Sequence, residues 1–348
     1  MKKLLSLLSL LCMSMGVFAQ GSLLATLSHD GQISAFYGAD ALKSAVAVAE
    51  AGDVITLSSG QFSSANISKP ITLRGSGMSV STDSINAHEA TIIQGDFTIN
   101  IADSLEGRVV MEGLYFNQKV TYAGVLKNAQ FLKCRFGQFV GSNNPVMTNT
   151  SFIHCRIFDY IYLYSNSNAF FINCIVNDPV CPSSSTVEFD NCFVKFDSQY
   201  INAGDATDVN NAYYKNCIIQ IRSGYGGSSM IIPSSCTAYN CIGLGYSDIF
   251  HYLVGKNNTN RYVSGLSNVF KTYNNTSSNI NDSDNFELTE TAATTYLGTD
   301  GTQVGIYGGN LAYDENPTIP QITKCNVASK STADGKLSVD IEVKAAEY

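Results

Sequence analysis

The sequence predicts an all-β chain that winds into a solenoid. A six-residue phrase recurs between residues 131 and 243, as FLKCRF, FIHCRI, FINCIV, FDNCFV, YKNCII and AYNCIG. Counted from Leu114, its equivalent positions lie 20, 21, 19, 18, 25 and 24 residues apart, which is the length of one solenoid coil. Only 14% of the residues are charged, while Tyr, Asn, Ser, Thr and Gly are abundant, as in β-rich exported chains.

The phrase predicts a strand, a left-handed turn and a second strand. Its Cys shares a strand face with the residue two positions later, because side chains alternate with period two. The aromatic three positions before the Cys is out of phase with that face, so a turn or bulge must lie between them. The slot just before the Cys holds Asn in four copies, Lys133 and His154 in two, and Gly113 in an earlier copy. Asn and Gly alternating at one slot indicate a positive φ.

The six cysteines of the phrase are expected to be free thiols. Equivalent residues of stacked coils lie roughly 4.8 Å apart with parallel Cα–Cβ vectors, a geometry that suits a disulfide badly. A buried thiol then acts as a small hydrophobe. No pairing can be assigned to Cys181, Cys236 and Cys325, which lie outside this ladder.

The chain before the repeat predicts a capping helix and the first coils. Residues 39–51 form an amphipathic pattern with apolar residues at i, i+3, i+4 and i+7, with Asp40 as the N-cap and Gly52 as the stop. A solenoid needs a cap because its first coil otherwise exposes its core. Strands are expected at 53–57, 67–73, 91–101 and 108–116.

The solenoid domain is expected to span residues 20–316. Residues 244–298 lose the phrase and become rich in Asn, Ser and Thr, which favours loops or irregular last coils. Residues 317–348 are interpreted as a C-terminal hairpin extension, since two alternating runs flank Asp334-Gly335. A lone hairpin is marginally stable, so it is expected to pack on the solenoid or on a partner.

At this point the chain resembles the right-handed parallel β-helix of the pectin lyase-like superfamily. The aromatic-x-Asn-Cys-x-apolar phrase and the run GDVITL, SSGQF, ISKPITLRGSG after the helix carry the resemblance, which covers roughly residues 39–310. It implies a single-stranded right-handed solenoid with three short parallel strands per coil. The resemblance does not imply an activity, because function lies in the site and not in the fold.

Residues 1–19 predict an export signal. Two lysines precede an apolar run over 4–11, and Val17-Phe18-Ala19 resembles a cleavage site. The run is too short to span a bilayer, and no later stretch is long enough to do so. We therefore expect an exported protein of the periplasm, cell surface or extracellular space. A net charge of −8 without a basic run argues against nucleic acid as a partner.

No catalytic motif is evident. The hydrolases of the superfamily carry Asn-Thr-Asp, Asp-Asp, Gly-His-Gly and Arg-Ile-Lys motifs, none of which occurs here, and the Trp of pectate lyase signatures is absent. A glycosidase needs only two carboxylates that face each other across a groove. The low-ranking catalytic candidates are Asp159, Asp178, Asp190 and Asp197. Turn capping or a solvated surface is the favoured interpretation of these four residues.

The sequence gives no support for a metal or another cofactor. The four histidines are His29, His88, His154 and His251, and none has metal-ligand spacing to another. Residues 282–287 faintly resemble an oxygen-ligand loop for Ca²⁺, but the Gly at the sixth position is missing. We therefore expect no metal site.

The most suggestive surface feature is a row of tyrosines. In FDYIYLYS, Ile161 and Leu163 share one strand face and Tyr160, Tyr162 and Tyr164 share the other. With a bulge near Asp159, the isoleucine and leucine face the core and the tyrosines face outward. Outward aromatic rows with polar tips can bind sugar rings, although Tyr also simply favours strands.

Two hypotheses follow. The favoured one is a non-catalytic glycan-binding or cell-surface interaction module that binds a polysaccharide or cell-surface glycan. The alternative is a polysaccharide lyase or glycoside hydrolase that acts on a plant or host polysaccharide. The sequence leaves the ligand and the oligomeric state open.

Overall fold

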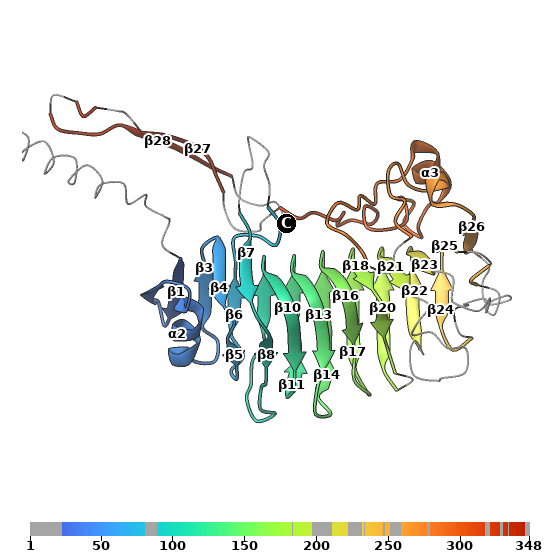
Figure 1. Ribbon diagram of the computed structural model, residues 1–348, viewed down its shortest axis with the longest axis horizontal. Coiled ribbons are helices and arrows are strands. Elements are labelled where there is room, and N and C mark those ends of the chain that lie inside the picture. The colour runs from blue at the N-terminus through green and yellow to red at the C-terminus, as the bar shows by residue number, and fades with distance from the viewer. Residues whose placement is uncertain are drawn as a thin grey trace, which may run out of the picture.

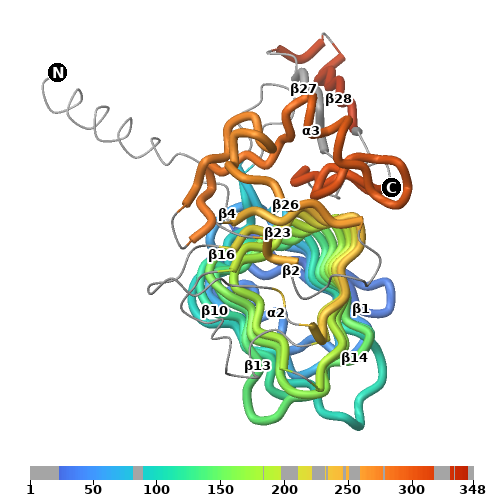
Figure 2. The backbone as a smooth tube through the Cα atoms, turned by 90° about the vertical axis from the view of Figure 1, so that its right-hand side faces the viewer, coloured from blue at the N-terminus to red at the C-terminus, as the bar shows by residue number. Residues whose placement is uncertain are grey.

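The chain forms a parallel β-solenoid of about eight turns (Figure 1 and Figure 2). The computed structural model describes residues 23–80, 89–182, 184–196, 211–221, 232, 234–245, 248–250, 259–276, 279–316, 321–327, 330–332 and 334–344. The expected export signal therefore lies outside the described residues.

One side of the solenoid is an eleven-stranded sheet, called sheet A. In spatial order its strands are β2 (Gln32–Tyr37), β1 (Leu24–His29), β3 (Val54–Leu57), β6 (Thr72–Arg74), β9 (Val110–Glu112), β12 (Gln130–Leu132), β15 (Thr150–Ile153), β17 (Asn168–Ile172), β20 (Thr186–Asp190), β22 (Ala212–Lys215) and β24 (Thr237–Tyr239). From β3 onward all neighbours are parallel, whereas β1 runs antiparallel to both β2 and β3.

The facing side is a thirteen-stranded parallel sheet, called sheet B. Its path runs through β26 (Arg261–Val263), β25 (Ile242–Leu244), β23 (Ile218–Ile221), β21 (Phe193–Phe196), β18 (Ile175–Asn177), β16 (Arg156–Tyr162), β13 (Arg135–Gly141), β10 (Tyr115–Tyr122), β7 (Thr91–Gln94) and β4 (Gly60–Ser63). Off this path lie β5 (Asn66–Ile67), β8 (Phe97–Ile99) and β19 (Pro179–Val180).

Two small sheets and three short helices complete the described structure. β11 (Val125–Lys127) pairs in parallel with β14 (Val146–Thr148), and β27 (Gln321–Val327) pairs antiparallel with β28 (Val339–Lys344). The helices are α2 (Ala41–Val48), the 3₁₀ turn η2 (Leu266–Asn268) and α3 (Glu290–Thr295).

The left-handed turn before each Cys is confirmed. The slot residues all have φ between +48° and +63°: Gly113, Lys133, His154, Asn173, Asn191, Asn216 and Asn240. Asn tolerates this region because its short polar side chain hydrogen-bonds locally, and Gly tolerates it because it lacks Cβ. Each coil therefore turns from sheet A into sheet B at the same place.

The aromatic three positions before each Cys stacks from coil to coil. Ring centroids lie 4.7 Å apart for Phe131–Phe152 and for Phe152–Phe171, 4.8 Å for Phe171–Phe189 and 5.1 Å for Phe189–Tyr214. All five side chains are fully buried. This column forms the centre of the apolar interior between the two sheets.

The cysteines of the phrase form a hydrogen-bonded thiol ladder, and they are free, as predicted. The Cys155 amide donates to Cys174 Sγ at 3.3 Å, and Cys174, Cys192 and Cys217 donate likewise to the next thiol at 3.4 Å. The left-handed turn leaves these backbone amides without a carbonyl acceptor on the neighbouring strand. The thiol of the next coil accepts their hydrogen bond instead. Cys181 and Cys236 are also free and buried. Burial raises the pKa of Cys134 to about 12, so this thiol is protonated at neutral pH.

The beginning of the chain differs from the prediction in several details. The helix is shorter than 39–51, and the Asp40 side chain makes no capping hydrogen bond but pairs with Lys43 at 3.1 Å. The expected strand at 67–73 is two short strands, β5 and β6, separated by a bend around Pro70. The stretches 91–101 and 108–116 also divide at glycines, Gly95 and Gly113.

A second apolar core covers part of the outer face of sheet B. The residue after each Cys points outward, and from β18 to β25 these residues are apolar: Ile175, Phe193, Ile218 and Ile242. Residues 264–276 and 279–296, here called the cover, pack on them through Val269, Phe270, Tyr273, Ile280, Phe286 and Leu288. Figure 1 shows this segment above the C-terminal half of the solenoid, and Asp282 of the cover reaches Arg135 on β13.

Phe152→Ala is expected to lower the free energy of unfolding by about 3–5 kcal/mol, because it opens a cavity in the aromatic column. Urea denaturation followed by circular dichroism measures the change. Leu311→Ala, at a position that is 50% exposed, is the control and should change stability by less than about 0.5 kcal/mol. Equal effects of the two substitutions would show that the column contributes little.

Candidate functional site

The three tyrosines lie on the outer face of β16 and just beyond it, as their spacing predicts. The register between β13 and β16 shifts after Phe136–Ile157, so the bulge falls at 158–159. Beyond it, Ile161 and Leu163 are fully buried, whereas Tyr162 is 37% exposed and its two neighbours are partly exposed. The rings of Tyr162 and Tyr164 meet edge to face at 6.1 Å. We call Tyr160, Tyr162 and Tyr164 the tyrosine face.

Hydrogen-bonded amides flank the tyrosine face on the earlier coils. Gln138, in register with Tyr160, donates to Asp159 Oδ2 at 2.5 Å. On the coil before Gln138, the Asn117 side-chain amide donates to the Gln94 side-chain oxygen. The Gln94 amide in turn donates to the Gln61 side-chain oxygen at 3.2 Å. The outer face of sheet B thus carries a row of amide donors and acceptors next to aromatic rings.

Two arginines, Arg135 and Arg156, lie at the edge of the cover that contacts β13 and β16. The Arg135 guanidinium lies 4.0 Å from the centroid of Tyr115 and 4.2 Å from that of Phe158, and Arg156 lies 4.8 Å from Phe158 on the other side. Arg135 also pairs with Asp282 of the cover at 2.6 Å. The stacked rings and guanidinium groups hold the edge of the cover against β13 and β16.

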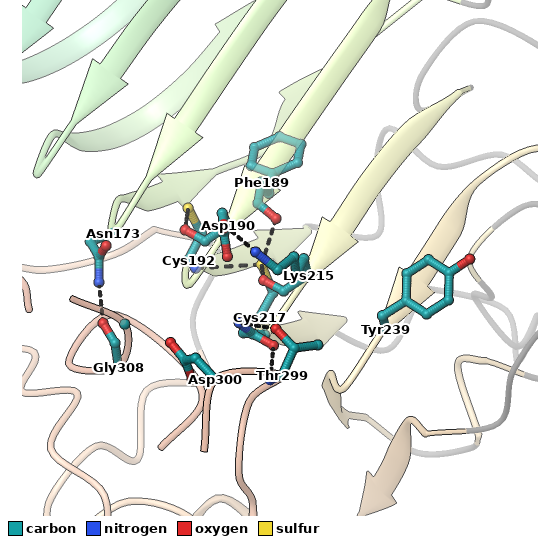
Figure 3. A network of polar contacts seen from close by, with 12 residues as sticks. Asn173, Phe189, Asp190, Cys192, Lys215, Cys217, Tyr239, Thr299, Asp300 and Gly308 are labelled. Carbon is teal, nitrogen blue, oxygen red and sulfur yellow. Dashed lines mark hydrogen bonds and ion pairs between the residues drawn. The ribbon is translucent and has the colours of Figure 1, made fainter. Parts of the chain in front are cut away.

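The turn residues before the cysteines also bind a second segment. Residues 297–316, here called the strap, run back along the coils, and Figure 3 shows their contacts with the turns. Asn240 donates to the Leu297 carbonyl at 3.2 Å, Asn216 to Thr299 Oγ1 at 3.3 Å, and Asn173 to the carbonyls of Ile306 and Gly308 at 2.8 Å each.

The slots that hold His154 and Lys133 meet the last part of the strap. His154 Nε2 lies 3.0 Å from the Leu311 carbonyl. Lys133 Nζ donates at 2.8 Å to Asp314 Oδ2 and to the Asn316 carbonyl. Burial is the largest single influence on the Asp314 carboxyl and raises its pKa, but the hydrogen bonds from Lys133 and Asn316 and the charge of Lys133 together lower that pKa below its ordinary value. Lys133 and His154 therefore each meet a local acceptor on the strap.

The candidate carboxylates do not gather at one place. Asp159 and Asp178 lie on neighbouring coils at the corner between β16 and β19, where the Asp178 carbonyl accepts from the Ile161 amide at 3.3 Å. Asp178 is 9% exposed and has φ +39°. Asp190 ends β20 in sheet A and pairs with Lys215 at 2.8 Å. Asp197 lies outside the described residues.

The histidines are separated in the structure. Burial lowers the pKa of His154, which contacts the strap. His29 Nδ1 contacts Asp53 Oδ1 at 2.8 Å beside the first coil, and this contact raises the pKa of His29. His88 and His251 lie outside the described residues. Within the described ranges there is no group of three or more His, Cys, Asp or Glu side chains that could hold a metal ion.

Sequence reasoning missed two features that short signals encode. The antiparallel pair β1–β2 turns at Asp30-Gly31, both with positive φ, and the same dipeptide was used to predict the hairpin near the C-terminus. The cover was missed because only the inward positions of the phrase were considered. The outward position after each Cys changes from arginine, in Arg135 and Arg156, to an unbroken apolar run from Ile175, which indicates a covering layer.

The comparisons with known proteins gave no match. No protein-family model, no curated protein and no solved structure is similar enough to the chain to be matched. Among the described residues, no helix is both long and apolar enough to cross a membrane.

Asn173→Gly is expected to cost about 2 kcal/mol of unfolding free energy, since it removes two buried hydrogen bonds to the strap and keeps the left-handed turn accessible. Asn143→Gly is the matched control, because Asn143 is exposed and also has positive φ, +61°. Chemical denaturation of both variants measures the difference. If both glycines have the same effect, the side-chain bonds to the strap do not stabilise the fold.

The His29–Asp53 contact predicts a pH effect. The folded-state pKa of His29 is raised above its ordinary 6.5, first through its hydrogen bond with Asp53. The contact therefore stabilises the fold fully below pH 6.5 and loses this contribution as pH rises through the folded pKa. An NMR titration of the imidazole should give a midpoint above 6.5, and Asp53→Asn should return it toward 6.5. An unchanged midpoint in that variant would contradict the assignment.

Proposed function

We propose that this protein is an exported, non-catalytic glycan-binding module and that the tyrosine face is its binding surface. The observation that carries the proposal is the row of outward tyrosines on β16 and just beyond it, of which Tyr162 is 37% exposed and Tyr160 and Tyr164 are partly exposed. Tyrosine presents an apolar ring with a polar tip, which suits the C–H faces and hydroxyl groups of a sugar. The row lies on a strand supported from below by the buried Ile161 and Leu163, so its rings are held at fixed spacing.

The flanking amides support a polysaccharide or cell-surface glycan as the ligand. Gln94, Asn117 and Gln138 provide donors and acceptors in a line that crosses successive coils. Successive coils lie about 4.8 Å apart, so such a line repeats on the scale of a sugar chain. Sugar hydroxyls can replace these amide–amide bonds without leaving a polar group unpaired.

We also propose the finer features of the architecture. The resemblance to the pectin lyase-like superfamily favours a right-handed solenoid. The buried Ala41, Leu42 and Ala45 of α2 favour a capping role for this helix at the first coil. The strand pair β27–β28 favours a C-terminal extension over a further coil. The predicted signal over residues 1–19 supports export to the periplasm, cell surface or medium.

A second candidate function rests on Asp159 and Asp178. They lie on neighbouring coils near the tyrosine face, and a pair of carboxylates is the minimum for glycoside hydrolysis. A polysaccharide lyase or hydrolase would lose its activity in Asp159→Asn. Release of reducing ends or unsaturated products from acidic and neutral polysaccharides reads out this alternative.

Tyr160→Ala combined with Tyr162→Ala is expected to weaken glycan binding at least tenfold, because two stacking surfaces are lost. A glycan array identifies the ligand, and calorimetry with that glycan measures the affinity of the chain from Gln20. Tyr262→Ala is the matched control, since Tyr262 is 38% exposed, against 37% for Tyr162, but lies on β26. Failure to bind any glycan, or equal loss in the control, would refute the proposed surface.

A further inference from the structure

Sheet A ends in a strand edge that lacks the usual protection. β2 is the outermost strand, and in the part of the chain that the structure describes no strand pairs with its outer edge. Proteins normally blunt such an edge with charges, proline, a bulge or a very short strand. β2 reads QISAFY, has six residues, and pairs with β1 in an unbroken register.

The outward side chains of β2 make this edge apolar. Ile33 is 74% exposed and Tyr37 is 68% exposed, and Ala35 lies between them on the same face. A long, uncharged, apolar edge is a template for pairing with another strand. By contrast, the last strands at the other end of the solenoid, β24 and β26, have three residues each.

The strand pair β27–β28 has a matching apolar row. Val339 and Ile341 are 51% exposed and Val343 is 57% exposed, while the alternate residues Asp340 and Glu342 are acidic. Figure 1 shows the pair extending away from the solenoid on the side of its N-terminal coils. A two-stranded sheet with an open apolar face is only marginally stable in water, so it gains from joining a larger sheet.

Pairing of β28 with β28 of a second copy is unfavourable. An antiparallel register centred on Ile341 keeps the apolar rows together but sets Asp340 of one copy opposite Glu342 of the other. Like charges directly opposite each other destabilise a sheet.

We propose that β28 of one copy pairs with β2 of a second copy and extends sheet A of that copy. In an antiparallel register with Ala35 opposite Ile341, Ile33 meets Val343 and Tyr37 meets Val339, so the two apolar rows become continuous. The acidic residues of β28 then lie opposite the uncharged Ser34 and Phe36. Main-chain hydrogen bonds supply most of the affinity in such strand addition. The contact is head to tail and repeats from copy to copy.

Analytical ultracentrifugation of the chain from Gln20 tests this contact. The average mass of the wild type should rise with concentration. Ile33→Asp with Tyr37→Asp, and separately Ile341→Asp with Val343→Asp, should each stay monomeric over the same range. Val48→Asp, at a position on α2 that is 58% exposed, is the control and should associate like the wild type. Circular dichroism verifies that each variant is folded.

A cross-linking experiment identifies the paired strands. Ala35→Cys and Ile341→Cys are introduced into separate copies in a Cys325→Ser background, mixed, and oxidised mildly. A disulfide-linked dimer that forms in the mixture and not from either variant alone supports the proposal. A wild type that is monomeric at every concentration would overturn it. Association abolished by the β2 variant and retained by the β28 variant would also overturn it, since it would indicate β2–β2 pairing.

Discussion

The left-handed turn before each Cys is the constraint on which the rest of the structure depends. It directs each coil from sheet A into sheet B, and it also displaces one backbone amide per coil from the strand ladder. A buried amide without an acceptor is costly, so the next coil must offer one. The thiol does so for four successive coils. A valine at this position would fill the space but could not accept the hydrogen bond, which accounts for a ladder of cysteines that form no disulfides.

The same turn explains how the strap is held. A residue with positive φ points its side chain away from the interior, so each turn from Lys133 to Asn240 presents one polar group at one corner of the solenoid. These groups form a line of donors, and the strap supplies mostly backbone carbonyls to it. A segment without regular secondary structure thereby satisfies its own polar groups against the solenoid. The turns that shape the coils are thus also the attachment site of residues 57 to 183 positions further along the chain.

The features that repeat from coil to coil could be predicted from the sequence, whereas the contacts that do not repeat could not. The turn, the free thiols and the phase of the tyrosine row all follow from period and alternation, and the structure confirms them. The contact of Lys133 with Asp314 spans 181 residues and has no periodic signal, so no local pattern reveals it. The cover was predictable in principle, because Ile175 and Phe193 would otherwise stand in water. The residues of the cover that pack on Ile175 and Phe193 could not be predicted, because they are spread over an irregular segment.

The two ends of the solenoid end their hydrogen-bond ladders in different ways. At the C-terminal end the thiol ladder stops at Cys241, whose amide donates at 2.9 Å to the side chain of Asn260. The Asn260 amide donates back to the Ala238 carbonyl at 2.9 Å, so one asparagine satisfies both an orphan amide and an orphan carbonyl of the last coil. At the N-terminal end β1 reverses direction against β3, which ends the parallel ladder but creates a new edge at β2. The Asn260 side chain supplies partners for the last groups of the thiol ladder. Adding β1 and β2 only moves the edge of sheet A from β3 to β2. In the part of the chain that the structure describes, the longer edge strand of sheet A is therefore β2 at the N-terminal end, whereas β24 at the other end has three residues.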